Sequence, residues 1–175
     1  YCEDGVSPRA VPSQKGGVHL CNGNEHLETG RITENPSLRT KITDKRMKKI
    51  ESAVSSKYLP RPKYYGDAGA RIGVMAIGSN VPAAAEALDI IADKTGRREF
   101  KIMQLTSLMP FCDKEVSDFI SKCDKVFVIE NNYSAQLCGL IKMRLPVHEK
   151  LVPVLKYDGI SFSAAEIAEK LMEVE

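Results

Sequence analysis

From about residue 70 onward, the hydrophobic residues of this chain alternate between two patterns: short apolar runs and apolar residues at helical spacing. Short, mainly apolar runs that predict strands occupy residues 71–77, 100–105, 125–129 and 151–155, and the run at 126–129 is continuous, as is typical of a strand buried on both faces. Apolar residues recur at helical spacing in residues 81–95, 113–122, 134–145 and 164–173. Strands that alternate with helices predict an α/β fold with an open, mainly parallel sheet and helices on both of its faces.

The first 69 residues follow a different pattern. Residues 1–40 are rich in Gly, Pro, Asn and Ser and show no sustained period, which indicates a long arm that packs on something else. From Asp44 the spacing becomes helical, with Thr43 as the expected N-cap. Residues 58–69 are rich in Pro and Gly, which indicates a linker. The predicted organisation is an arm and helix over 1–57, a linker over 58–69 and a globular domain over 70–175.

A polar cluster follows the apolar run at residues 125–129. Its members are Glu130, Asn131, Asn132 and Gln136. Ligands and partners of open α/β sheets bind at the carboxyl ends of the strands, so this cluster is a candidate site. Its large hydrogen-bonding capacity favours an inter-domain or inter-subunit contact. In the alternative, Glu130 and Asn131 satisfy local backbone groups, and Gln136 caps a helix or cross-links within the domain.

One dense basic stretch lies on the helix predicted from Asp44 and just before it. It consists of Arg39, Lys41, Lys45, Arg46, Lys48 and Lys49. Such a face can attract a phosphorylated cofactor or an acidic partner, although it is more often simply solvated. The chain as a whole has 25 Lys+Arg against 23 Asp+Glu, a formal charge of +2, so we expect neither nucleic acid nor an anionic membrane as a partner.

Other candidate groups are weaker. Gly78-Ser79-Asn80 opens a helix after a strand, but it is not a dinucleotide-binding fingerprint. The segment 25–28, Glu-His-Leu-Glu, with His19 and Glu34 nearby, more often forms a hydrogen-bonded loop than a metal site. The five cysteines contain no C-x-x-C pair and fit neither a zinc module nor an iron–sulfur ligand run, which indicates a reducing, cytoplasmic compartment. There is no apolar run of membrane-spanning length and no signal-peptide pattern.

Short segments spread along the whole chain carry a further signal. They are residues 3–10, 16–19, 23–30, 33–34, 39, 45–50, 78–79, 108–111, 130–137 and 156–162. In this order they resemble the alpha subunit of 2-oxoacid:ferredoxin oxidoreductases, with the 2-oxoglutarate type as the best match. The first residue is Tyr1 rather than Met, and we expect this chain to be the C-terminal portion of such a subunit.

The resemblance implies an enzyme that uses thiamine diphosphate to decarboxylate a 2-oxoacid. It implies that the acyl group passes to coenzyme A and that the electrons pass through iron–sulfur clusters to ferredoxin. Residues 1–57 would be the tail of the pyrimidine-binding thiamine domain, and residues 70–175 would be similar to the transketolase C-terminal domain. The diphosphate and its Mg²⁺ would be held by the beta subunit. The clusters would lie on other polypeptides, including gamma and delta subunits where these are present.

On this interpretation the isolated chain is inactive, holds none of these cofactors alone, and supplies scaffold and subunit interface. No catalytic residue is carried over to it. A coenzyme A contact from Lys45, Arg46, Lys48 and Lys49 is a further hypothesis.

The chain departs from the family pattern at several positions. Ala135 stands where the family has Gly, Cys112 where it has a second Pro, and Asn80 and Pro82 where it has Thr and a following Gly. The changes at 80 and 82 weaken any phosphate-binding role of that loop. The alternatives are a non-catalytic assembly or regulatory α/β module and a flavodoxin-like nucleotide binder, which the glycine pattern disfavours.

Overall fold

The computed structural model describes residues 2–173, and the chain divides into two compact units, Tyr1–Leu59 and Pro60–Glu175. Each unit is described by itself.

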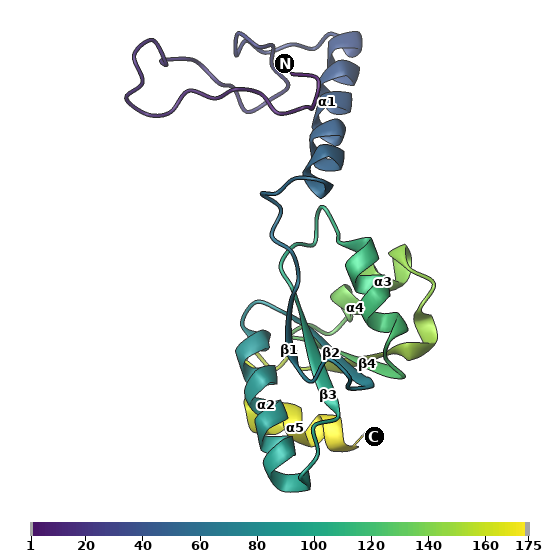
Figure 1. The fold of residues 1–175 in the computed structure, drawn as a ribbon. Helices are drawn as coiled ribbons and strands as arrows, with labels where there is room; N and C mark the ends of the chain where they lie inside the picture. The colour runs from purple at the N-terminus through teal and green to yellow at the C-terminus, as the bar shows by residue number, and fades with distance from the viewer. Residues whose placement is uncertain (1, 174–175) are drawn as a thin grey trace. The chain divides into compact units, whose positions relative to one another are not determined.

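The second unit is built on a five-stranded sheet (Figure 1). Its strands are β1 (Lys63–Gly66), β2 (Ile72–Ile77), β3 (Phe100–Leu105), β4 (Lys125–Glu130) and β5 (Leu151–Leu155). Their order across the sheet is β1-β3-β2-β4-β5, and all neighbours are parallel except β1, which runs antiparallel to β3 at one edge. The carboxyl ends of β2, β3, β4 and β5 therefore lie along the same side of the sheet, which we call its carboxyl edge.

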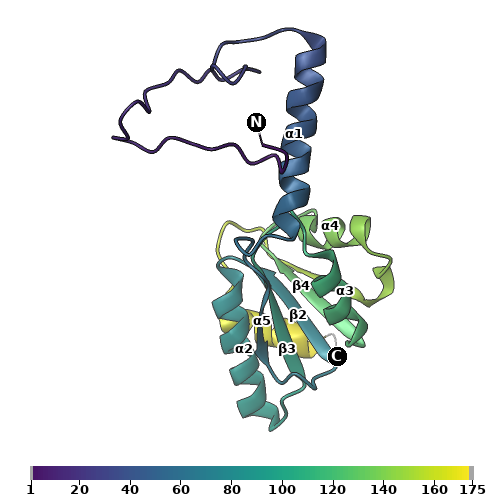
Figure 2. The same cartoon turned by 45° about the horizontal axis from the view of Figure 1, so that its top comes forward.

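Helices cover both faces of this sheet. They are α2 (Asn80–Thr95), α3 (Asp113–Ser121), α4 (Gln136–Arg144) and α5 (Ala164–Glu173), with a short 3-10 helix at His148–Lys150. Helices α2 and α5 pack on one face, and α3 and α4 pack on the other (Figures 1 and 2). The predicted α/β fold is confirmed.

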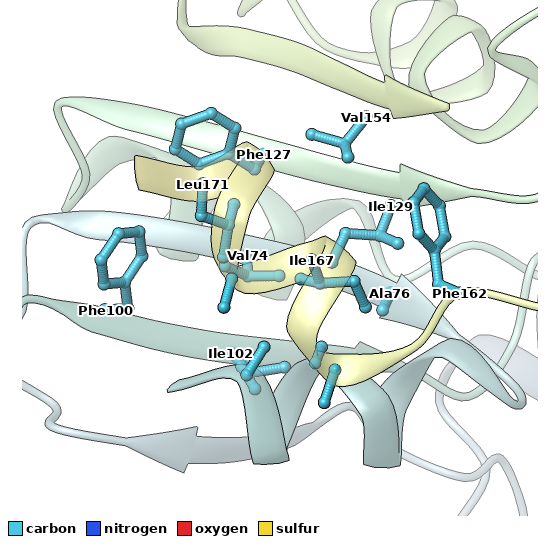
Figure 3. Close-up of a cluster of buried hydrophobic side chains, with 14 of the residues drawn as sticks. Val74, Ala76, Phe100, Ile102, Phe127, Ile129, Val154, Phe162, Ile167 and Leu171 are labelled. Atoms are coloured by element: carbon cyan, nitrogen blue, oxygen red, sulfur yellow. The ribbon is translucent and has the colours of Figure 1, made fainter. Parts of the chain in front are cut away.

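Alternation along β4 explains why its sequence is apolar from Val126 to Ile129. Phe127 and Ile129 belong to the cluster under α2 and α5, where they lie close to Ile167 and Leu171 of α5 (Figure 3). Val126 and Val128 belong to the cluster under α3 and α4. Because successive side chains point to opposite faces, a strand that is covered on both sides has no solvent-facing positions in its middle.

Residues 58–69, where the sequence predicts a linker, contain β1. Its pairing with β3 runs from Lys63, opposite Gln104, to Gly66, opposite Lys101. All four residues of β1 are exposed, so the strand lacks the apolar run that marks a covered strand. The prolines and glycines that flank it concealed it further, because they are typical of a loop.

The first unit contains one long helix, α1 (Pro36–Val54), preceded by an arm of turns. Asn35 caps this helix, and its side-chain oxygen accepts hydrogen bonds from the backbone N–H groups of Ser37 (3.0 Å) and Leu38 (3.2 Å). The prediction that the helix begins at Asp44 was wrong by two turns. Asn35 followed by Pro36 is a strong signal for the start of a helix, since proline is well suited to the first helical position. The residues between Pro36 and Asp44 lack a clear helical spacing of apolar residues, so the periodicity did not reveal this part of the helix.

Candidate functional site

The Glu130 carboxylate at the end of β4 is turned into the domain. Glu130 is 4% exposed. One carboxylate oxygen accepts hydrogen bonds from the backbone N–H of Leu137 (2.7 Å) and from the side-chain amide of Asn132 (2.8 Å), and the other accepts from the backbone N–H of Cys138 (2.9 Å). Helix α4 starts with N–H groups that have no partner within the helix, so Glu130 satisfies these donors and places a negative charge at the helix N-terminus.

The loop between β4 and α4 presents its other polar groups outward. Asn131, Tyr133, Ser134 and Gln136 are exposed. Asn132 is half-buried, and its side-chain oxygen accepts a hydrogen bond from the backbone N–H of Gln136 (3.2 Å). Of the four residues predicted as an interface, Glu130 and Asn132 thus build the loop, while Asn131 and Gln136 are exposed on its surface. Their contact with a partner stays a prediction.

Ala135 adopts the left-handed conformation, with φ of 51°, directly before α4. An L-residue with a Cβ adopts this conformation at a cost, whereas glycine adopts it readily. The bonds that Glu130 makes to the first turn of α4 hold the backbone there. The loop is therefore a fixed surface feature of the domain.

Large apolar side chains are exposed in the loops that follow β3, β4 and β5, and they were not predicted from the sequence. Leu108 and Met109 follow β3, Tyr133 follows β4, and Tyr157 and Ile160 follow β5. The rings of Tyr133 and Tyr157 meet edge to face with centroids 5.1 Å apart. We name these five residues together with Asn131 and Gln136 the carboxyl-edge surface. The signal that could have found it is the occurrence of apolar residues inside loops that follow parallel strands, all at the same edge.

The Gly78-Ser79-Asn80 turn lies at this edge as well, after β2. Asn80 is buried, and its side-chain amide donates to the carbonyl of Ile129 in β4 (3.4 Å). Ser79 occupies the N-cap position of α2 and makes no side-chain capping bond. Asn80 therefore joins α2 to the neighbouring strand.

In the first unit, the arm and α1 line a hollow of about 1040 Å³ that is open to solvent. Its lining includes five basic side chains, Arg9, Arg39, Lys45, Arg46 and Lys49, and also His19, Cys21, Glu25 and His26. Lys48 does not line it. We name this feature the basic hollow. The predicted basic quartet is thus divided, because three of its members share the hollow and the fourth is exposed elsewhere on the helix.

Glu25 lines the basic hollow in a forked ion pair with Arg46. The two Arg46 nitrogens donate to the two carboxylate oxygens at 2.9 and 2.6 Å. The hydrogen bond from Arg46 holds the pKa of Glu25 below its usual value. Glu28 and Glu34 also line the hollow. Across residues 2–173, no three His, Cys, Asp or Glu side chains converge as metal ligands.

The cysteines are all free thiols. Cys112, Cys123 and Cys138 are buried, and burial raises the pKa of each. Cys2 and Cys21 are exposed. In the part of the chain that the structure describes, no helix combines the length and apolar character needed to cross a membrane.

Comparison with curated proteins identifies relatives over nearly the whole chain, although no family model matches it. The alpha subunit of 2-oxoacid:ferredoxin oxidoreductase 1 from Sulfurisphaera tokodaii is 33% identical over 177 residues, which cover 99% of this chain and 27% of the relative. The corresponding subunit from a Sulfolobus species is also 33% identical over 99% of this chain, and a subunit from Aeropyrum pernix is 29% identical over 98%. This chain is homologous to part of the alpha subunit of 2-oxoacid:ferredoxin oxidoreductases.

Solved structures agree with this homology. A 2-oxoglutarate:ferredoxin oxidoreductase from Magnetococcus marinus, determined with 2-oxoglutarate, coenzyme A and succinyl-CoA bound, superimposes with a TM-score of 0.77 at 26% identity. The match covers 98% of this chain and 29% of that one. A split-gene transketolase matches 65% of this chain with a TM-score of 0.53 at 15% identity, which shows a shared fold. The resemblance that the sequence motifs carry is confirmed, and the chain spans about a quarter of the length of its oxidoreductase relatives.

Proposed function

We propose that this chain is part of a 2-oxoacid:ferredoxin oxidoreductase of the 2-oxoglutarate type. The enzyme would oxidatively decarboxylate the 2-oxoacid to an acyl-CoA and pass the electrons to ferredoxin. The observation that carries the proposal is the match to the Magnetococcus marinus enzyme, which covers 98% of the chain and thus includes both units. The buried free thiols favour a cytoplasmic enzyme, because cysteines stay reduced there.

Residues 1–57 would be the tail of the pyrimidine-binding thiamine domain, and residues 70–175 would correspond to the transketolase C-terminal-like domain. Thiamine diphosphate with its Mg²⁺ and the iron–sulfur clusters would be held elsewhere in the complex. The side-chain amide of Asn80 in the glycine turn donates to the Ile129 carbonyl of β4, which weakens a phosphate-binding role of that turn.

The role proposed for the second unit is to form an interface with the beta subunit, or with gamma and delta subunits where these are present. The carboxyl-edge surface supports this role, because exposed aromatic and apolar side chains flanked by amides are typical of the core of an interface. Tyr133 is the most exposed of the five apolar and aromatic residues, at 76%, and aromatic residues contribute much of the binding energy in interfaces.

Co-purification with a tagged beta subunit tests this role in the full-length protein. We expect Tyr133→Ala and Asn131→Ala to lower the yield of complex, while the complex that still forms keeps the wild-type KM for 2-oxoglutarate. Lys94→Ala is a matched control, since Lys94 is exposed at the end of α2 that lies away from the carboxyl edge. If both variants assemble as the wild type does, the interface lies elsewhere.

The activity itself is tested by reduction of a dye or ferredoxin in the assembled complex. We expect reduction to require both 2-oxoglutarate and coenzyme A. A complex that assembles correctly but reduces no acceptor with any 2-oxoacid would favour a non-catalytic assembly or regulatory module.

We further propose that the basic hollow contacts coenzyme A, whose phosphates are attracted by clustered cations. The division of the basic quartet gives a matched test. Lys45→Ala and Lys49→Ala should each raise the KM for coenzyme A, whereas Lys48→Ala should leave it unchanged. A tenfold rise would correspond to a loss of about 1.4 kcal/mol of binding free energy. Replacing Lys45, Arg46, Lys48 and Lys49 together by Ala without any change in coenzyme A affinity would reject this contact.

A further inference from the structure

The arm of the first unit holds a cysteine against an imidazole. The sulfur of Cys21, which is exposed, lies 3.6 Å from Nε2 of His26 and 3.9 Å from the carbonyl oxygen of Asn22, so the thiol has two acceptors, and the imidazole is the nearer. The segment that carries them is tied down by backbone bonds from Leu27 N–H to the Arg31 carbonyl (2.9 Å) and from Thr33 N–H to the Glu25 carbonyl (2.9 Å). The ion pair between Glu25 and Arg46 joins the same segment to α1. The approach of the two side chains is therefore part of a folded loop.

The contacts of the two His26 ring nitrogens with Asn24 and Cys21 fit one tautomer of the neutral ring. Nδ1 lies 3.1 Å from the backbone carbonyl of Asn24, which can only accept a hydrogen bond. In the neutral ring, Nδ1 therefore carries the proton, and Nε2 presents a lone pair to the Cys21 thiol. A thiol that donates to an imidazole can pass its proton to the ring, and the thiolate that remains is the nucleophilic form of cysteine.

The surroundings of this pair determine which reagent it suits. Cys21 and His26 both line the basic hollow, together with Arg39, Lys45 and Lys49. Of the three carboxylates that line it, Glu25 is neutralised by its bidentate bond to Arg46, and Glu28 and Glu34 are outnumbered by the cations of Arg9, Arg39, Lys45 and Lys49. A hollow of about 1040 Å³ has room for a molecule the size of a small peptide, and its cations attract negative charge. A small neutral oxidant such as hydrogen peroxide would gain nothing from these cations.

We propose that Cys21 is a site of thiol–disulfide exchange with low-molecular-weight disulfides that carry anionic groups. His26 takes the thiol proton, and the Cys21 thiolate attacks one sulfur of the disulfide. A new bond forms between Cys21 and that sulfur as the original S–S bond breaks. The other half leaves as a thiolate and takes up the proton from His26, so the products are a mixed disulfide on Cys21 and one free thiol. The proposal does not depend on the activity of the complex.

The full-length protein is tested with two probes, glutathione disulfide, which is anionic, and bis(2-hydroxyethyl) disulfide, which is neutral. Mass spectrometry of peptides follows the mixed disulfides at Cys21 and at Cys2. Cys2 is the internal control, because it is also exposed but is followed in the chain by Glu3 and Asp4 instead of facing an imidazole across a loop. We expect glutathione disulfide to modify Cys21 at least about tenfold faster than Cys2.

Two variants separate the contributions of the imidazole and of the charge. His26→Gln should slow modification of Cys21 by both probes, by about tenfold, because the proton acceptor is lost. The double variant Lys45→Gln/Lys49→Gln should slow the anionic probe severalfold and leave the neutral probe unchanged. Equal rates at Cys21 and Cys2, an unaffected His26→Gln variant, no modification of Cys21 in the full-length protein, or equal slowing of both probes by the lysine changes would each overturn the proposal.

Discussion

Replacing Glu130 by Gln should destabilise the second unit strongly, although the change removes only a charge and adds no volume. The carboxylate accepts hydrogen bonds from two backbone N–H groups of α4 and from Asn132, at 2.7 to 2.9 Å. A glutamine amide has a single oxygen, and its NH₂ group would face one of the remaining donors. With Glu130 only 4% exposed, water cannot replace the lost bond.

The size of the effect follows from these contacts. A hydrogen bond to a charged group contributes about 1.5–3 kcal/mol, and a buried donor left without a partner costs about 1–3 kcal/mol. The charge at the helix N-terminus adds about 0.3–1 kcal/mol. Since the remaining oxygen still satisfies part of the network, we expect a net loss of about 2–4 kcal/mol.

Urea unfolding of the full-length protein measures this loss, and hydrogen exchange locates it. The amide protons of Leu137 and Cys138 should exchange faster in Glu130→Gln, because both donate to the carboxylate. Glu149→Gln is the control, since Glu149 is exposed and surface changes usually stay within about 0.5 kcal/mol. A loss below about 0.5 kcal/mol for Glu130→Gln, or unchanged exchange at these two amides, would refute the assignment of Glu130 as the cap of α4.

Gly73→Ala should destabilise the sheet by about 1–3 kcal/mol in urea unfolding, because overpacking a tight core has this cost, and the added Cβ would lie 2.8 Å from the Phe119 ring. Gly139→Ala in α4 is the opposite case: its Cβ meets nothing within 4 Å, so a gain of about 0.5–1 kcal/mol is expected from helix propensity, and a loss would contradict the structure there. Glu166 has its pKa lowered from 4.5 to about 2, chiefly by the hydrogen bond from Lys156. A carboxyl with a lowered folded-state pKa stabilises the fold above its unfolded pKa and loses this contribution as pH falls through the folded one. The urea midpoint of the wild type should therefore drop between about pH 4.5 and 2 more steeply than that of Glu166→Gln, and parallel curves would contradict the pairing.

The sequence was sufficient for the elements that bury apolar residues on one or both faces. Strand β3 has the predicted bounds, Phe100–Leu105, and α5 has the predicted bounds, Ala164–Glu173. In both, the hydrophobic pattern begins and ends with the element itself. The failures have a common physical cause. The first two turns of α1 and the edge strand β1 are set by a cap and by backbone pairing, and neither leaves a periodic apolar pattern in the sequence.

The candidate sites were less accessible to sequence reasoning, because they depend on contacts between distant residues. The ion pair between Glu25 and Arg46 joins positions 21 residues apart, and it helps to convert a basic helix face into the wall of a hollow. The edge-to-face pair of Tyr133 and Tyr157 likewise joins the loops after β4 and β5. Both residue types were visible in the sequence, but their partners were set by the fold.

The direction in which the Glu130 side chain points determines its role in the polar cluster. The count of polar residues at the end of β4 led to the prediction that Glu130 lies in an interface together with Asn131. Alternation along the strand indicates instead that the Glu130 side chain points into the domain. Val126 and Val128 face α3 and α4. Because every second residue of a strand points to the same face, Glu130 also points toward α4. A carboxylate on that face, seven residues before the helix N–H to which it bonds, is where a cap is needed. Alternation along the strand therefore separates the members of the cluster: Glu130 holds the loop, and Asn131 and Tyr133 are exposed on it, where contact with a partner is a prediction.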